Sequence, residues 1–444
     1  MSHQAFIVTG LGYGDEGKGS IVDWLTVEHR VNTVIRTGGP QALHRVVTSA
    51  GHEHVFSQFG SGTLRGAATH LSCNMICAPS ALLREGLLLA NLCGRDVFSE
   101  VTIHADCLLV TPIQAVTGRV RELLRGDGRR GSVGVGVGET VRDSTKRGER
   151  ALRARDLSSP HLGEKLRDLW QDKWSEYESS TDRASGLREP MGAKVRAQMA
   201  LISNGDLLHQ TIKEFVELAQ RIRIVDDDYV TEKILSPSGT VVFEGSQGVL
   251  LDRVYGFYPY TTKVRSTPET SSEILTASGY RGEVHSLGIL RSYATRHGFG
   301  PFVTEDAILT KALPDARNHN DDWQGNFRIG HFDAVATLYA TKVCGPQAFD
   351  ALVITCLDRT NKLDNWSACT AYYNSSTETI LNANTLLQYK NNPAGHLSTL
   401  LDACQPVLQS GSGKPVETIA ELIGIPVYAV STGVTEKDKR LFTS

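Results

Sequence analysis

The sequence predicts an α/β protein with a large, mostly parallel central sheet, covering helices and insertions. Short apolar runs that end in turns recur at residues 5–9, 31–36, 241–243, 351–355 and 427–430. Between them lie helical patterns, for example at 333–343 and 415–422. Strands that alternate with helices are typical of parallel sheets, because a parallel return needs a long crossover connection.

Length and composition agree with a globular protein. The 444 residues can bury a substantial core, and a hydrophobic fraction of 40% with 42 glycines indicates a compact chain with many turns. We interpret residues 1–444 as a single domain with insertions, in which about 100–240 form a mostly helical and loop subregion. A net charge of -3 gives no general attraction to nucleic acid or to a membrane, so neither partner is expected.

The cysteines and the amino terminus exclude two further classes. The closest cysteine pair, Cys73 and Cys77, lacks the spacing of a zinc site. Residues 1–6 carry no basic segment followed by an apolar one, and no apolar run is long enough to span a bilayer. We therefore expect a cytoplasmic protein with free thiols.

The first predicted strand ends in a glycine-rich loop, residues 10–20, and a helical spacing begins after Gly19. Backbone amides at such a strand–helix junction can bind phosphate, so a nucleotide site is predicted here. The spacing from Gly12 to Lys18 matches a P-loop, but Gly19 replaces the metal-binding Ser or Thr of that loop. Glycines 12, 14 and 17 also match a dinucleotide-binding loop. No acidic residue follows about twenty positions later to bind a ribose, which argues against a dehydrogenase.

The string Gly-Asp-Glu-Gly-Lys-Gly at 14–19 resembles the opening of the adenylosuccinate synthetase family. Matching blocks follow in order along the chain, at 38–44, 61–65, 243–252, 258–260, 287–290, 295–296, 300–305, 332–336, 357–358 and 431–433. The resemblance implies the fold of that family, which is related to the P-loop NTPases. It also implies a ligase that uses GTP to form a carbon–nitrogen bond.

The family phosphorylates the 6-oxo group of inosine monophosphate (IMP) and lets the amine of aspartate displace the phosphate, so one difficult step becomes two easier ones. By resemblance, Asp15 is the base that removes the ring proton and also a ligand of Mg²⁺. His44 is the acid that stabilises the oxygen, and Lys18 neutralises phosphate charge. Gln247 orients the purine.

The resemblance also implies which residues bind GTP. These residues are Gly14, Glu16, Gly17, Lys18, Gly19, Ser20, Asp358, Ser431, Thr432 and Gly433. The Asp358 carboxylate can accept from two guanine N–H groups that adenine does not offer, which favours GTP over ATP. Cys356 stands where the family has a lysine that stacks on the base.

Several acceptor-side positions depart from the family. Gln41 replaces an asparagine that contacts the substrate phosphate, and Leu43 replaces a glycine whose carbonyl binds the metal, a role the Leu43 carbonyl can keep.

The Ser132-Val133 segment replaces two threonines and an arginine near the nucleotide phosphate. Thr262 and one of Lys146 or Arg147 remain as phosphate ligands, and Arg147 would reach across a homodimer interface.

The largest departure is the loop that binds the two carboxylates of aspartate. Only Arg328 remains of its usual arginine cluster. One guanidinium suits a single carboxylate, a neutral amine or ammonia better than a dicarboxylate. The nearby Arg317, His319 and the Asp321-Asp322 pair could instead form a different site, and the two aspartates could attract a cationic amine.

Three functions remain open from the sequence. The default is the ligation of IMP with aspartate. A specialised relative could join another amine to a different purine-like acceptor in a modified-nucleotide or natural-product pathway, although Asp15 argues against a guanine-type acceptor. A GTP-binding regulatory protein is the third possibility, but binding alone does not require both Asp15 and His44. The expected partners are GTP, a purine nucleotide-like acceptor, an amine donor and a second copy of the chain.

Overall fold

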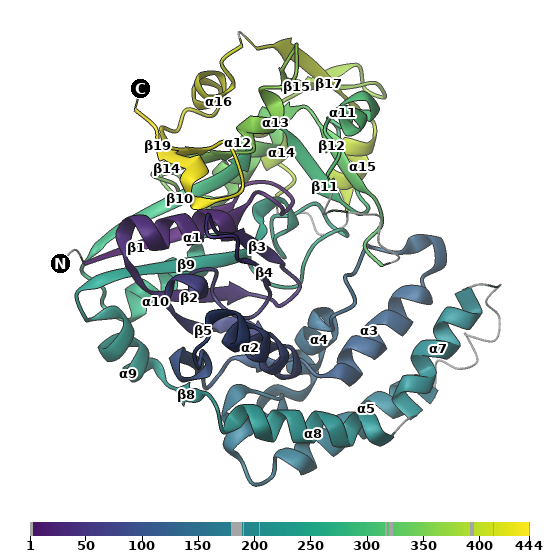
Figure 1. The fold of residues 1–444 in the computed structure, drawn as a ribbon. Helices are drawn as coiled ribbons and strands as arrows, with labels where there is room; N and C mark the ends of the chain where they lie inside the picture. The colour runs from purple at the N-terminus through teal and green to yellow at the C-terminus, as the bar shows by residue number, and fades with distance from the viewer. Residues whose placement is uncertain are drawn as a thin grey trace.

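The computed structural model describes residues 3–178, 189, 191–203, 205–315, 318, 323–390, 395–411 and 413–443. Its centre is an eleven-stranded sheet in the order β19-β18-β14-β10-β1-β9-β2-β5-β6-β8, with β7 beside β5 (Figure 1). The strands are β1 His3–Gly10, β2 Val31–Gly38, β5 Ala68–Cys77, β6 Val101–His104, β7 Leu108–Leu109, β8 Arg223–Val225, β9 Gly239–Gly248, β10 Glu283–Arg291, β14 Ala351–Thr355, β18 Val427–Ser431 and β19 Lys439–Leu441.

The predicted parallel sheet is confirmed. Of the described pairings in this sheet, the one between β18 and β19 is antiparallel and the others are parallel. Each apolar run recognised in the sequence lies within a strand. Central strand β1 is buried from Ala5 to Gly10, as expected for a strand covered on both faces.

The helices cover this sheet and extend beyond it. Their bounds are α1 Lys18–His29, α2 Pro79–Cys93, α3 Pro112–Leu123, α4 Val137–Arg147, α5 Leu162–Glu178, α7 Met191–Ser203, α8 Gly205–Ala219, α9 Asp227–Tyr229, α10 Glu269–Ala277, α11 Ala307–Ala312, α12 Ala334–Cys344, α13 Leu357–Thr360, α14 Ala383–Leu387, α15 His396–Asp402 and α16 Pro415–Ile423. Both helices predicted above appear, as α12 and α16. Asp333 is the N-cap of α12, and its carboxylate accepts from the amide of Ala336 at 2.9 Å.

The region around 100–240 contains several helices in succession. Helices α3, α4, α5, α7 and α8 form an arm at the lower right of Figure 1. The same region also supplies β6, β7 and β8 to the central sheet. The arm is therefore continuous with the main body of the protein.

Smaller sheets lie around the central one. They contain β3 His44–Val47 with β4 Glu53–Phe56, β11 Ala294–His297 with β12 Phe327–Gly330, and β15 Ser367–Asn374 with β13 Phe332–Asp333, β16 Thr379–Leu381 and β17 Cys404–Ser410. Within the described residues, no helix is long and apolar enough to cross a membrane.

The strand order determines where a site can form. Strand β1 lies between β9 and β10, and β14 and β18 follow on the same side. Because these strands are parallel, the loops that leave their carboxyl ends meet along one edge of the sheet. Ligands of open α/β sheets bind at this edge.

Candidate active site

The loop between β1 and α1 has the geometry of an anion site. Helix α1 begins after Gly17, which has a φ of 90° and provides no side-chain cap. The first amides of α1 therefore have no side-chain acceptor, and the helix dipole favours an anion in front of them. Ser20, in the first turn, contacts the Val434 carbonyl at 3.5 Å through its hydroxyl.

Glu16 lies inside this loop rather than on its surface. Its Oε1 accepts from the amides of Gly12 at 3.0 Å and Gly14 at 2.8 Å, and its Oε2 accepts from Lys18 Nζ at 2.6 Å. Both charged side chains are only 3% exposed. Burial raises the pKa of Glu16, but the adjacent Lys18 ammonium outweighs it and the net pKa is lowered. In this conformation the carboxylate orders the loop, and the predicted contact of Glu16 with GTP stays a prediction.

The backbone of Asp15 and Glu16 is held from two neighbouring strands. Asp15 has a φ of 62°, which is unfavourable for most residues and is found at strained functional positions. Arg291, at the end of β10, donates from Nε to the Asp15 carbonyl. Thr355, at the end of β14, donates to the Glu16 carbonyl at 2.8 Å. Sequence reasoning missed both residues, although the position of Thr355 at the end of the predicted strand 351–355 was a usable signal.

His44 belongs to a buried ionic network. Its Nδ1 lies 2.5 Å from Glu244 Oε1, and its Nε2 lies 3.2 Å from the Ser246 carbonyl. Arg36 Nη1 is 3.1 Å from the same Glu244 oxygen, and the side chains of Arg36 and Glu244 are fully buried. The Ser61 amide and hydroxyl also donate to Glu244, at 3.0 and 2.5 Å. The imidazole is therefore fixed in orientation.

Burial and charge act in opposite directions on this network. Burial raises the pKa of Glu244, but Arg36 and His44 dominate and lower it to about 2. Burial lowers the pKa of His44, and the Glu244 carboxylate opposes that effect. A proton on Nδ1 faces a carboxylate, so Nε2 is the nitrogen that can exchange its carbonyl contact for a substrate oxygen.

The acceptor-side residues lie next to His44. Gln41 Nε2 donates to Thr262 Oγ1 at 3.0 Å, so the structure joins two residues that were predicted to contact the acceptor. The side chain of Gln247 lies beside Gly14, with Oε1 3.9 Å from where a Cβ on that glycine would stand. Leu43 is 65% exposed, and the contact of its carbonyl with a metal ion stays a prediction.

The residues expected to bind guanine come together at the ends of β14 and β18, which are adjacent parallel strands. Asp358 lies in α13, which begins after Cys356, a residue with a φ of 62°. Ser431 donates to the Gly433 carbonyl at 3.0 Å, and the Thr432 amide donates to the Asp438 carbonyl at 2.9 Å. The contact between Ser20 and Val434 links the segment after β18 to the start of α1.

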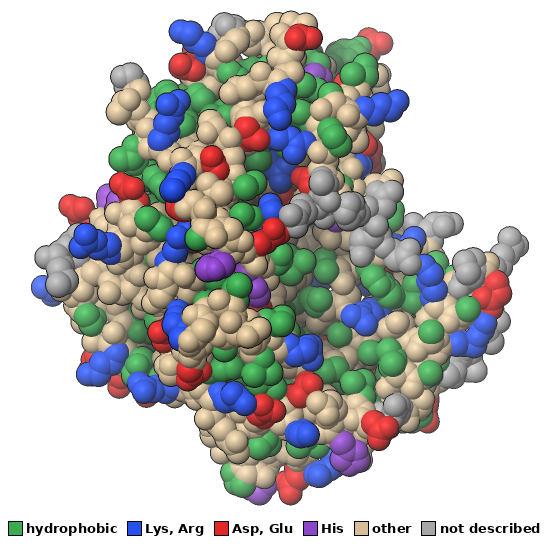
Figure 2. Space-filling view, in the orientation of Figure 1, with side chains coloured by type: hydrophobic (Ala, Val, Ile, Leu, Met, Phe, Trp, Pro, Cys, Tyr) green, Lys and Arg blue, Asp and Glu red, His purple; other side chains and the backbone are tan. Residues whose placement is uncertain are grey.

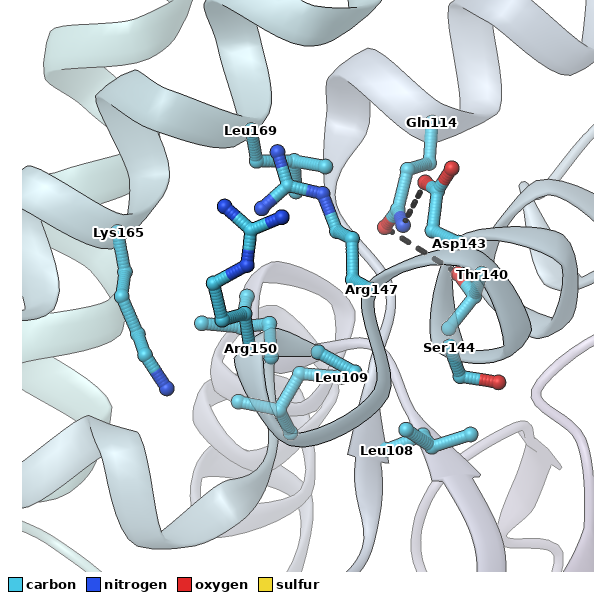
Figure 3. A pocket seen from close by; sticks show the side chains of 12 residues that line it. Leu108, Leu109, Gln114, Thr140, Asp143, Ser144, Arg147, Arg150, Lys165 and Leu169 are labelled. Atoms are coloured by element: carbon cyan, nitrogen blue, oxygen red, sulfur yellow. Dashed lines mark hydrogen bonds between the residues drawn. The ribbon is translucent and has the colours of Figure 1, made fainter.

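Two predicted phosphate contacts are engaged elsewhere. Ser132 Oγ accepts from the Gly134 amide at 3.3 Å within the loop that also contains Val133. Arg147 donates to Asp168 at 2.9 Å and also to Asp172. Figure 3 shows the Arg147 guanidinium beside that of Arg150 in a pocket between α4 and α5. Arg147 is therefore bound within its own chain, and its phosphate role in a dimer stays a prediction.

Arg328 is also paired internally. It lies on β12, and its guanidinium donates to Glu305 at 2.8 Å and to the carbonyls of Gly298 at 2.7 Å and Gly300 at 2.9 Å. A second carboxylate would have to displace one of these contacts. The alternative group of Arg317, His319, Asp321 and Asp322 lies outside the described residues.

Comparisons with known proteins agree with this arrangement. The adenylosuccinate synthetase family model matches residues 7–440. The chain is 31% identical to adenylosuccinate synthetase 1 of Pseudoalteromonas translucida, with 96% of each chain covered. It is 30% identical to the adenylosuccinate synthetase of Blochmanniella pennsylvanica, over 97% of this chain and 96% of that one.

Solved structures share the fold. The fully ligated adenylosuccinate synthetase from Plasmodium falciparum superimposes with a TM-score of 0.76 at 18% identity, covering 99% of both chains. The succinoaminodeoxyadenylate synthetase of cyanophage S-2L, bound to dGMP and dATP, gives a TM-score of 0.60 at 16% identity, covering 100% of this chain and 97% of that one. From the family match over nearly its whole length and the site assembled at the sheet edge, we conclude that the chain belongs to the adenylosuccinate synthetase family.

Proposed function

We propose that this protein joins an amine to a purine nucleotide at the expense of GTP, with IMP and aspartate as the default pair. The observation that carries this proposal is the juxtaposition of Asp15, Lys18 and Gln247 with the His44–Glu244 network at one sheet edge. A protein that only binds GTP has no need of an acid and a base beside the phosphate loop.

In the proposed reaction, Asp15 removes the N1 proton of the purine while its backbone is held by Arg291. The 6-oxygen, now more nucleophilic, attacks the γ-phosphorus of GTP, and GDP leaves. The amine then attacks C6, and the C–O bond breaks to release inorganic phosphate.

His44 stabilises the oxygen in this scheme. Its Nδ1 stays on Glu244, and Nε2 leaves the Ser246 carbonyl to donate to the transferred phosphoryl group. A fixed donor in a buried site stabilises developing charge more strongly than a mobile one in water, since no reorganisation is needed during the reaction.

Lys18 and the first turn of α1 hold the GTP phosphates, and Asp358 selects guanine. Mg²⁺ binds in proteins through one or two carboxylates together with substrate phosphates, so Asp15 and the Leu43 carbonyl suit it as ligands. When bound, the ion would neutralise charge on the phosphates. Within the described residues, no group of three or more acidic, His or Cys side chains could hold a metal alone, which fits a nucleotide-dependent site.

The direct test is phosphate release from GTP by the purified protein with Mg²⁺ and IMP, followed by mass analysis of the products. Aspartate-dependent formation of adenylosuccinate is expected. The proposal fails if GTP binds but no phosphate is released with any acceptor and amine.

A second candidate is ligation of a different amine, and the contacts of Arg328 favour it. Its guanidinium is already engaged by Glu305 and two carbonyls, which leaves little capacity for a dicarboxylate. The same assay decides, with ammonia, monocarboxylic amino acids and cationic amines in place of aspartate. Because the cyanophage protein of the same fold is described with dGMP and dATP, deoxynucleotides and ATP belong in the panel.

A further inference from the structure

Trp323 joins the upper part of the protein to the helical arm. It lies just before β12, which pairs with β11 in the upper part, whereas α3 and α7 belong to the arm (Figure 1). Figure 2 shows that the surface is hollowed between these two parts. The half-buried Trp323 side chain nevertheless packs against an apolar cluster of the arm. This cluster contains Val120 and Leu123 of α3 with Val195 and Met199 of α7.

Arg119 of α3 contacts both Trp323 and the glycine-rich loop before α4. Its guanidinium lies 5.7 Å from the centre of the Trp323 ring, within the range of cation–π attraction. Its Nε donates to the Gly134 carbonyl at 2.9 Å. A Cβ on Gly134 would stand only 3.0 Å from this Nε, so the arginine could not lie this close to a larger residue. Arg119 therefore links Trp323 to the loop 131–136.

The rest of the segment 323–328 transmits this contact to Arg328. The Gln324 carbonyl abuts Gly298, at the end of β11, so closely that no Cβ could be accommodated there. The Gly298 amide donates to the Asn326 carbonyl at 2.9 Å, and the Gly298 carbonyl accepts from Arg328 at 2.7 Å. The position of the Arg328 guanidinium is thus connected, residue by residue, to the tryptophan held on the arm.

We propose that Arg119 and Trp323 are positioning residues that hold the segment 323–328 beside the loop 131–136, so that the amine donor meets a preformed site. The proposal rests on the proposed function, in which this segment binds the amine and Arg328 is its remaining arginine. The free energy needed to order a loose segment is subtracted from the affinity for its ligand. Both residues act through the segment and not on the reacting atoms.

The test compares Trp323→Ala and Arg119→Met with the parent enzyme, using GTP, IMP and aspartate, or whichever amine of the panel supports phosphate release. Each variant should raise KM for the amine by about 10-fold, as expected when the competent segment is populated in about one molecule in ten. KM for GTP and kcat should stay within about 2-fold, since saturating amine restores the ordered segment. Trp323→Phe keeps an aromatic ring and should retain most of the affinity for the amine.

The double variant tests whether the two residues act together. Because both changes release the same segment, the double variant should raise KM for the amine little further than Trp323→Ala alone. Trp174→Ala is the matched control, since Trp174 packs in a separate apolar cluster of the arm, with Ile113 and Ile202. Independent effects that multiply in the double variant, or an equal effect of Trp174→Ala, overturn the proposal.

Hydrogen exchange of the free protein, followed by mass spectrometry, separates this proposal from the proposed function. The amides of residues 323–328 should exchange faster in both variants than in the parent, and at the parent rate in Trp174→Ala. Unchanged exchange in both variants, or faster exchange without a rise in KM for the amine, overturns the positioning role and leaves the ligase proposal standing. If no amine supports turnover in the parent, the ligase proposal fails, and the exchange rates decide whether the two residues hold the segment.

Discussion

Replacing Glu244 by glutamine should destabilise the protein and slow its reaction. The carboxylate is the shared acceptor for Arg36, His44 and Ser61, and its side chain is fully buried. A neutral amide of nearly the same shape leaves the Arg36 guanidinium buried without its counter-charge. It also removes the acceptor that fixes Nδ1 of His44.

Two independent estimates give the loss of folding free energy expected for the Glu244→Gln variant. The difference between the ordinary pKa of 4.5 and the value of about 2 for Glu244 corresponds to about 3 kcal/mol at neutral pH. Mutational experience with broken buried ion pairs gives roughly 3–5 kcal/mol. We therefore expect the free energy of unfolding to fall by about 3 kcal/mol.

The pH dependence of this difference has a defined sign. The pKa of Glu244 is lower in the folded state, so its contribution to stability is complete above pH 4.5 and is lost as the pH falls towards 2. Urea unfolding of parent and variant at pH 7 should differ by the full amount, and the difference should shrink below pH 4.5. Other carboxylates titrate in both proteins and cancel in the comparison.

Glu53→Gln is the matched control, because the Arg45–Glu53 pair is about one third exposed and such pairs contribute roughly 0–1 kcal/mol. A Glu244 variant with the stability of the parent at pH 7 would refute the reasoning. In the same preparation, kcat should fall by roughly 10-fold to 1000-fold, since an acid that is no longer oriented loses part of its contribution.

Three further predictions concern the nucleotide side. Asp15→Asn should lower kcat by roughly 10²-fold to 10⁴-fold; the urea midpoint should stay the same, and unchanged turnover would exclude Asp15 as the base. Asp358→Asn should raise KM for GTP by about 10-fold to 100-fold, because one charge-assisted hydrogen bond is lost; steady-state kinetics with GTP and ATP check this, and equal losses for both would contradict guanine selection. Lys18→Met should weaken GTP binding in calorimetry and lower the free energy of unfolding by roughly 3 kcal/mol, since Glu16 loses its buried partner; a fully stable variant would show that the pair is dispensable.

The sequence predicted the fold well because the strong signals were local. Buried parallel strands give continuous apolar runs, and the loop after β1 carries an unusual string of residues. The motif residues lie along one edge of the sheet because parallel strands bring their carboxyl ends together. The relation to the P-loop NTPases stays a prediction.

Pairing between distant side chains could not be predicted in the same way. Nothing in the string at 14–19 indicates that the Glu16 carboxylate turns inwards onto two amides. The partners of Arg147 and Arg328 lie 21 to 30 positions away in sequence, and their choice depends on helix and hairpin packing. The resemblance to the family predicted Arg147 and Arg328 as substrate ligands from residue type and position alone. It carried no information on the carboxylates and carbonyls that bind the two guanidinium groups within this chain.

The strand order also determines when the candidate site can assemble during synthesis of the chain. Strand β1 is synthesised first, yet Ser20, at the start of the helix that follows it, contacts Val434, close to the last described residue. Closing such a long loop is slow, because contacts between distant segments must offset a large entropy loss. For most of translation, the glycine-rich loop of a nascent chain therefore lacks the residues after β18 that contact it in the folded protein. If Ser431, Thr432 and Gly433 bind the base as proposed, a product truncated before β18 would lack these residues and should not select guanine.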